Sequence, residues 1–193
     1  MSVKREEIVR DELTEAIAKK YGELLEIEEA IEEGKKVIED YRRTSLELAE
    51  TFYWFVRTRM RDYAEETNST GVEFLAFVTT EGFALILEGE EDRVEAPVKE
   101  AVAEVHTHPD LCLPSGQDYR TAWHLFSRGL VVFSVYSVQC YFSVALTGPY
   151  TEEDYVKLLS LSREVKKVRT VDEYFSVVRK YAFEGLTLSV LPP

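Results

Sequence analysis

The sequence predicts a mixed α/β (α+β) fold in which helices flank a central mixed β-sheet, with a helical extension at the N-terminus. The first third of the 193-residue chain carries apolar residues three or four positions apart, the spacing of one helix face. After the segment TNSTG (67–71) the apolar residues form short runs typical of strands. Strand and helix patterns then alternate, an order that favours helical layers around one sheet.

The N-terminal third is expected to contain two helical stretches. The first covers Lys4–Glu33 and is expected to end at Gly34. Its apolar stripe comprises Ile8, Leu13, Ile17, Tyr21, Leu24, Ile27 and Ile31. The second runs from about Lys35 to Glu66, and the two form either a packed hairpin or one kinked rod. The stripe has to be buried against the second stretch or against a second copy of the chain, and we favour a homodimer through this arm. We therefore assign residues 1–44 to an extension and 45–193 to the main domain.

The middle of the chain is expected to form the sheet. Residues 71–87 predict two strands joined at 79–82. An acidic loop (88–92) and the segment 94–100 follow, and AVAEVHTHP (101–109) predicts a strand that ends in a proline-containing loop. A helix is expected from Asp118 to Ser127.

An uncharged run of 23 residues, Gly129–Thr151, is long enough to span a bilayer. It is rich in Val, Phe, Tyr and Ser and is interrupted near 137–139, so a buried β-hairpin is the better interpretation. Thr151 and Asp154 predict a capping box for a helix that continues to about Arg169. A further helix over 171–183 and a last strand in LTLSVL (186–191) complete the expected order.

Charge and cysteine content exclude some partners. Lysines and arginines minus aspartates and glutamates give 23 − 36 = −13, which argues against nucleic acid or an anionic membrane as the main partner. The N-terminal residues lack the apolar core of a secretory signal. Cys112 and Cys140 form no CxxC pair and suggest no disulfide framework, so we expect free thiols and a cytoplasmic protein.

Two of the three histidines, His106 and His108, lie two residues apart in a predicted strand, so both rings point to the same face. Asp118, at the expected start of the next helix, can supply a third ligand. Two histidines and one carboxylate leave a fourth position for water, the arrangement of a catalytic zinc site. Zinc lowers the pKa of that water to about 7. The alternative is a strand with two hydrogen-bonded histidines and no metal.

The whole run EVHTHPDLCLPSGQD (104–118) resembles the signature of the JAMM/MPN+ zinc metalloproteases. The matching positions are His106, His108, Pro109, Ser115 and Asp118, with Glu73 as the upstream glutamate. The resemblance covers roughly residues 50–147. It implies a sandwich of the MPN/cytidine-deaminase type, bound Zn²⁺, and cleavage of ubiquitin or ubiquitin-like modifiers from lysine conjugates or from precursors.

The chain departs from that family pattern in two places. Nine residues separate His108 from Asp118, one fewer than is usual. The sequence separation between Glu73 and His106 is also short. It leaves little room for the insertion that binds the substrate tail in relatives. Both departures concern substrate choice and remove no ligand. By the same resemblance, the modifier's extended tail is expected beside an exposed strand near Glu73 and the following loop.

The catalytic roles follow from the chemistry of each side chain. Glu73 would take a proton from the attacking water and return it to the leaving amine. Ser115 would donate its hydroxyl to the oxyanion, or alternatively cap the following helix. Glu104 competes with Glu73 because strand parity places it on the face of His106; we favour Glu73, since a base must lie over the open position of the metal. Alternative functions are a JAMM hydrolase acting on a sulfur-carrier protein or another peptide, and a non-catalytic MPN scaffold.

Overall fold

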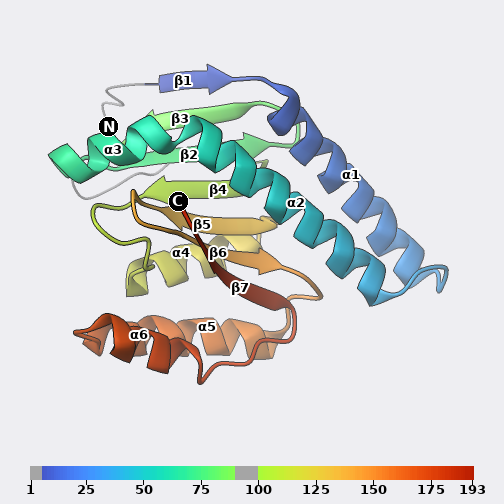
Figure 1. The fold of residues 1–193 in the computed structure, drawn as a ribbon. Helices are drawn as coiled ribbons and strands as arrows, with labels where there is room; N and C mark the ends of the chain where they lie inside the picture. Colours follow the sequence, from blue (N-terminus) through green and yellow to red (C-terminus); the bar gives the residue numbers. More distant parts are fainter. Residues whose placement is uncertain (1–5, 90–99) are drawn as a thin grey trace.

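A seven-stranded mixed sheet forms the centre of the computed structural model, which describes residues 6–89 and 100–193 (Figure 1). The strands are β1 Glu6–Val9, β2 Phe74–Thr79, β3 Ala84–Glu88, β4 Ala101–Thr107, β5 Val132–Tyr136, β6 Tyr141–Leu146 and β7 Leu186–Leu191. Their order is β1-β3-β2-β4-β5-β6-β7. Among the described strands only β4 and β5 pair in parallel, so the sheet is mixed as predicted.

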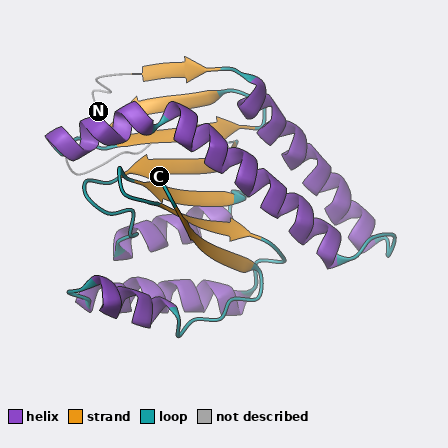
Figure 2. Cartoon of the chain, viewed as in Figure 1, coloured by secondary structure: helices purple, strands orange, loops and turns teal. Residues whose placement is uncertain are grey.

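Helices cover both faces of the sheet (Figure 2). They are α1 Glu12–Glu32, α2 Ile38–Arg59, α3 Arg61–Thr70, α4 Gly116–Phe126, α5 Glu152–Glu164 and α6 Val171–Val178, with a 3₁₀ turn at Val165–Lys167. Apolar side chains of α1, α2 and α3 pack on one face, and those of α4, α5 and α6 pack on the other. The predicted mixed α/β class is therefore confirmed.

The N-terminal helices form a packed hairpin, one of the two arrangements that the sequence left open. Ile17, Leu24 and Ile27 of the α1 stripe are buried in the same core as Leu48 and Phe52 of α2. Much of the stripe that we expected to be available for a dimer is thus covered within the chain. The boundary expected at residues 44 and 45 falls inside α2.

The predicted start of the first helix at Lys4 is wrong. Residues Glu6–Val9 form β1, whose Ile8 pairs with Leu85 of β3. The helix begins only after Asp11, whose carboxylate accepts hydrogen bonds from the backbone N–H groups of Leu13 and Thr14, both at 3.0 Å. This N-cap fixes the start of α1 and leaves the residues before it extended.

The second helical stretch also divides. It breaks at Met60 into α2 and α3, and α3 ends where Gly71 adopts φ of +78°, a left-handed conformation that glycine adopts without a steric penalty. The chain turns at Gly71 and enters β2 three residues later. Glu73, the predicted base, therefore lies at the end of the sheet.

The remaining elements follow the predicted order. The strands on either side of 79–82, the strand that carries the histidines, the helix after Ser115 and the β5–β6 hairpin are all present. No helix in the described residues has the length and apolarity needed to cross a membrane. The acidic loop and the segment 94–100 lie largely within 90–99, outside the described residues.

The last two helices end earlier than predicted, at Glu164 and Val178. Thr151 caps α5 by accepting a hydrogen bond from the N–H of Asp154 at 3.1 Å. The Asp154 carboxylate does not complete a capping box. It accepts bonds from the backbone N–H groups of Glu184 and Gly185, both at 2.8 Å, and so ties α5 to the start of β7.

The expectation of two free thiols is wrong, because Cys112 and Cys140 form a disulfide. They are 28 residues apart in sequence. Cys112 lies in the loop between β4 and α4, and Cys140 lies in the turn between β5 and β6, which the parallel pairing of β4 and β5 brings alongside. Spacing alone gave no sign of this proximity. The pairing also removes free thiols as an argument for a cytoplasmic location.

Candidate metal centre

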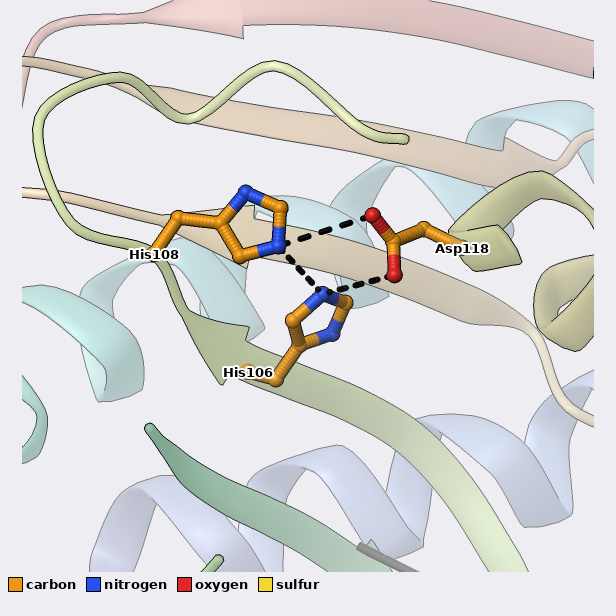
Figure 3. Close-up of side chains that lie close together, drawn as sticks. All are labelled: His106, His108 and Asp118. Atoms are coloured by element: carbon orange, nitrogen blue, oxygen red, sulfur yellow. Dashed lines mark hydrogen bonds and ion pairs between the residues drawn. The ribbon is translucent and has the colours of Figure 1, made fainter. Parts of the chain in front are cut away.

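His106 and His108 lie at the end of the central strand. His106 is the penultimate residue of β4 and pairs with Leu75 of β2 and Val135 of β5. His108 follows the strand, and its backbone N–H donates to the carbonyl of Tyr136 at 2.9 Å. Their rings meet edge-on, with 3.2 Å between the two Nε2 atoms (Figure 3). The shared face that strand parity predicted is therefore present.

Asp118 reaches the histidines from the first turn of α4, and a reciprocal cap holds it there. The Ser115 Oγ accepts from the N–H groups of Gln117 and Asp118, each at 3.2 Å. In return the Ser115 N–H donates to Asp118 Oδ2 at 2.5 Å. Ser115 thus caps the helix, the alternative considered from its sequence. Both of these bonds use its oxygen as acceptor, and the Ser115 side chain also helps to lower the pKa of Asp118.

The three side chains form a triangle of donor atoms of the size that a metal requires (Figure 3). His106 Nε2 lies 3.3 Å from Asp118 Oδ1, and His108 Nε2 lies 3.5 Å from Asp118 Oδ2. Tetrahedral ligands at 2.0–2.2 Å from an ion stand about 3.3–3.6 Å from one another. The two His–Asp118 separations, each to a different carboxylate oxygen, lie within that range, the 3.2 Å between the ring nitrogens lies just below it, and one ligand atom from each residue lies within 4.8 Å of the other two. This triad can hold a metal ion.

The electrostatics of the triad favour a positive centre between its members. Burial alone would lower the pKa of His106, but the carboxylates of Asp118 and Glu104 outweigh it and raise that pKa to about 10. Burial and the neighbouring His106 charge lower the pKa of His108 to about 4. Burial opposes ionisation of Asp118, yet the two histidines hold its pKa well below the usual range. Neutral His108 and ionised Asp118 are the forms that bind metals, whereas His106 has to release the proton on Nε2 when a metal binds.

The two candidate bases lie on different sides of the triad. Glu73 immediately precedes β2; its Oε1 is 3.9 Å from His108 Nε2, and its side chain is 42% exposed. Partial burial raises the pKa of Glu73. Glu104 Oε1 instead lies 3.4 Å from Nδ1 of His106, the ring nitrogen that points away from the donor triangle. Of the two, Glu73 is the carboxylate beside the donor atoms and open to solvent.

Thr107 helps to fix the position of Glu73. This role of Thr107 was not identified from the sequence. Its side chain points to the opposite face from the histidines, where its Oγ1 accepts the N–H of Phe74 at 2.8 Å. It also lies 2.6 Å from Oγ1 of Thr67 in α3. The residue between the two histidines therefore joins the end of α3, the start of β2 and the end of β4. Side chains alternate between the two faces of a strand, so the sequence could have indicated that Thr107 points away from the histidines.

The loop between the histidines and Asp118 is held at its centre. Backbone groups of Leu111 and Leu113 interact with the ring of His108 and favour its protonated form, although burial outweighs them. Cys112, between these two residues, is fully buried and carries the disulfide to Cys140. The disulfide therefore anchors the segment that orients one of the metal-binding rings. These contacts use backbone groups, so residue spacing in the sequence gives no indication of them.

Among the described strands, the strand that follows Glu73 has no open edge. β2 is paired with β3 on one side and β4 on the other, and β3 is itself covered by β1. Strand addition to β2 itself therefore has no open edge among the described residues, and binding of a modifier tail elsewhere near Glu73 stays a prediction. His124, the third histidine, is exposed on α4 and stands apart from the triad.

Comparisons with protein-family models, with curated proteins and with solved structures gave no match to this chain.

Proposed function

We propose that this protein is a zinc-dependent isopeptidase of the JAMM/MPN+ type, with a fold of the MPN/cytidine-deaminase kind. The observation that carries the proposal is the donor triangle of His106, His108 and Asp118 with Glu73 at its solvent side. Two imidazole nitrogens and one carboxylate oxygen form a catalytic zinc set, in which one position is left for a ligand from solvent.

The chain's own residues supply the proton transfers. When bound, zinc acts as a Lewis acid and lowers the pKa of a coordinated water to about 7. Glu73 accepts a proton from the attacking water and delivers it to the leaving amine. Because Glu73 is partly exposed, it can contact both solvent and substrate. Its raised pKa makes the carboxyl group better able to hold a proton and then donate it to the leaving amine.

Ser115 stabilises the charge that develops on the scissile carbonyl oxygen. Its Oγ accepts two backbone hydrogen bonds in the cap of α4, which fixes the oxygen whose proton would be donated to the oxyanion. A donor that is held in place before the reaction contributes more than one that must reorganise. The same cap orients Asp118, so Ser115 serves both the metal ligand and the oxyanion.

The substrate class is proposed from the JAMM/MPN+ resemblance: ubiquitin or a ubiquitin-like modifier joined to a lysine side chain, or the precursor of such a modifier. The test is incubation of the zinc-loaded protein with panels of ubiquitin-like conjugates and precursors, with and without a chelator. We expect cleavage at the modifier's C-terminus that a chelator abolishes and added zinc restores. The exposed His124→Gln variant is the control and should cleave normally. Zinc binding without cleavage of any modifier would contradict the substrate class, and cleavage of sulfur-carrier precursors alone would favour the alternative hydrolase.

A further inference from the structure

A buried carboxylate that the proposed reaction does not use lies directly behind the metal triad. Glu104 occupies the centre of β4, where it pairs with Phe77 of β2 and Phe133 of β5. Its side chain is only 3% exposed. A glutamate so enclosed is rare unless it has a partner, because removing a carboxylate from water is costly.

The partner of Glu104 is His106, and the contact uses one carboxylate oxygen. Oε1 lies 3.4 Å from Nδ1 of the ring, while Oε2 is buried with no hydrogen-bond partner in the described part of the chain. A half-satisfied carboxylate weakens the fold relative to an apolar residue of similar size. Packing therefore gives no reason for an acid at this position. The contact with Nδ1 of His106 does give one.

The geometry of the ring assigns each nitrogen a separate task. Nε2 of His106 points into the triangle, 3.2 Å from His108 Nε2 and 3.3 Å from Asp118 Oδ1. Nδ1 points at Glu104. A proton held on Nδ1 by the carboxylate leaves the lone pair of Nε2 free for a metal.

We propose that Glu104 is a positioning residue for the metal: its carboxylate accepts the Nδ1 proton of His106, fixes the tautomer and direction of the ring, and increases the basicity of Nε2. The inference rests on the proposed metal site and extends it to a residue outside the triad. His108 is oriented differently, through neutral backbone groups of Leu111 and Leu113. The two rings are thus unequal, and His106 is the one supported by a charge.

Zinc affinity, measured by chelator competition on the purified full chain, tests this assignment. We expect Glu104→Leu to weaken zinc binding about 10–100-fold, the usual effect of losing the outer partner of a ligating histidine. Glu104→Gln keeps a neutral acceptor and should lose less. Asp154→Asn is the matched control, since Asp154 is an equally buried carboxylate that bonds only to backbone in α5 and near β7. It should keep the wild-type zinc affinity.

Thermal melting of the metal-free proteins separates positioning from a structural role. Because one oxygen of Glu104 has no partner, we expect metal-free Glu104→Leu to lose less stability than Asp154→Asn, which removes an acceptor from two backbone donors. A structural role for Glu104 predicts the opposite order. A Glu104→Leu protein that binds zinc as tightly as the wild type would overturn the inference and leave the proposed function standing.

Nitrogen-15 spectra of histidine-labelled, zinc-loaded protein give a second readout, which also serves if Glu104→Leu does not fold. The chain has only three histidines, and His124→Gln identifies one of them. We expect the His106 ring protonated at Nδ1, with its proton resonance shifted upfield in Glu104→Gln because an amide oxygen is a weaker acceptor than a carboxylate. An unchanged resonance would overturn the assignment. A wild-type protein that binds no zinc would refute the proposed function and this inference together.

Discussion

Removing the disulfide between Cys112 and Cys140 should weaken both the fold and the metal centre. The bond closes a loop of 28 residues that contains α4 and β5. It also anchors the segment whose backbone holds His108. The double variant Cys112→Ala/Cys140→Ala removes the cross-link without leaving a thiol near the metal site.

The size of the stability loss follows from the length of that loop. The chain-entropy relation gives about 12 cal/mol/K for closing a 28-residue loop, or about 3.6 kcal/mol at 25 °C. Unfolding a chain of 193 residues has an entropy of about 0.4 kcal/mol/K near its midpoint, so Tm should fall by about 9 °C. Zinc affinity should fall by up to about 10-fold, since the partners of His108 are loosened and not deleted.

The assay compares the oxidised wild type, the wild type reduced with a phosphine, and the double variant. A phosphine is preferred to a thiol because thiolates themselves bind zinc. Alkylation of the unfolded protein followed by mass spectrometry verifies the redox state of each sample. A double variant that melts within about 2 °C of the oxidised wild type would refute the entropy argument, and labelling of both cysteines without reduction would refute the disulfide itself.

Three further outcomes are expected. Asp11→Ala should lower the free energy of unfolding by about 1 kcal/mol, measured by urea denaturation, because it removes the cap of α1. Although burial opposes it, the Thr14 backbone and Arg59 hold the pKa of Asp11 in the folded protein below 3.8. The contribution of Asp11 to stability is therefore present above pH 3.8 and is lost as the pH falls through the folded pKa. Equal effects of Asp11→Ala on the free energy of unfolding at pH 7 and pH 2 would contradict this. Deleting residues 1–34 should cause aggregation, seen by light scattering, since α1 covers the α2 core; a soluble truncated monomer from a dimeric parent would instead support dimerisation through the arm. Glu73→Gln should keep zinc and fold but cut turnover by about 10²-fold or more; full activity there with an inactive Glu104→Gln would identify the other carboxylate as the base.

Much of the site was predictable because short-range geometry places it. Strand parity puts His106 and His108 on one face, and the short loop before the next helix allows Asp118 to fold back toward them. The contacts that hold the site were not predictable from spacing. The disulfide and the bond from Thr107 to Phe74 depend on which strands become neighbours in the sheet.

The errors in the fold have a similar origin. Ile8 continues the apolar spacing of α1, but the N-cap at Asp11 makes the helix begin only after that residue. Residues 6–9 pair instead with the edge of β3. Periodicity identifies a face to be buried and does not say what buries it. For the same reason the stripe of α1 was compatible with a dimer until its packing on α2 was known.

Zinc stoichiometry is the most direct test of the central claim, that His106, His108 and Asp118 form a metal centre. The protein would be stripped with a chelator, reloaded with zinc, freed of excess metal and analysed by elemental mass spectrometry. We expect one zinc per chain in the wild type and in His124→Gln, and none retained in His108→Ala. Full zinc occupancy in His108→Ala, or none in the wild type, would contradict the account.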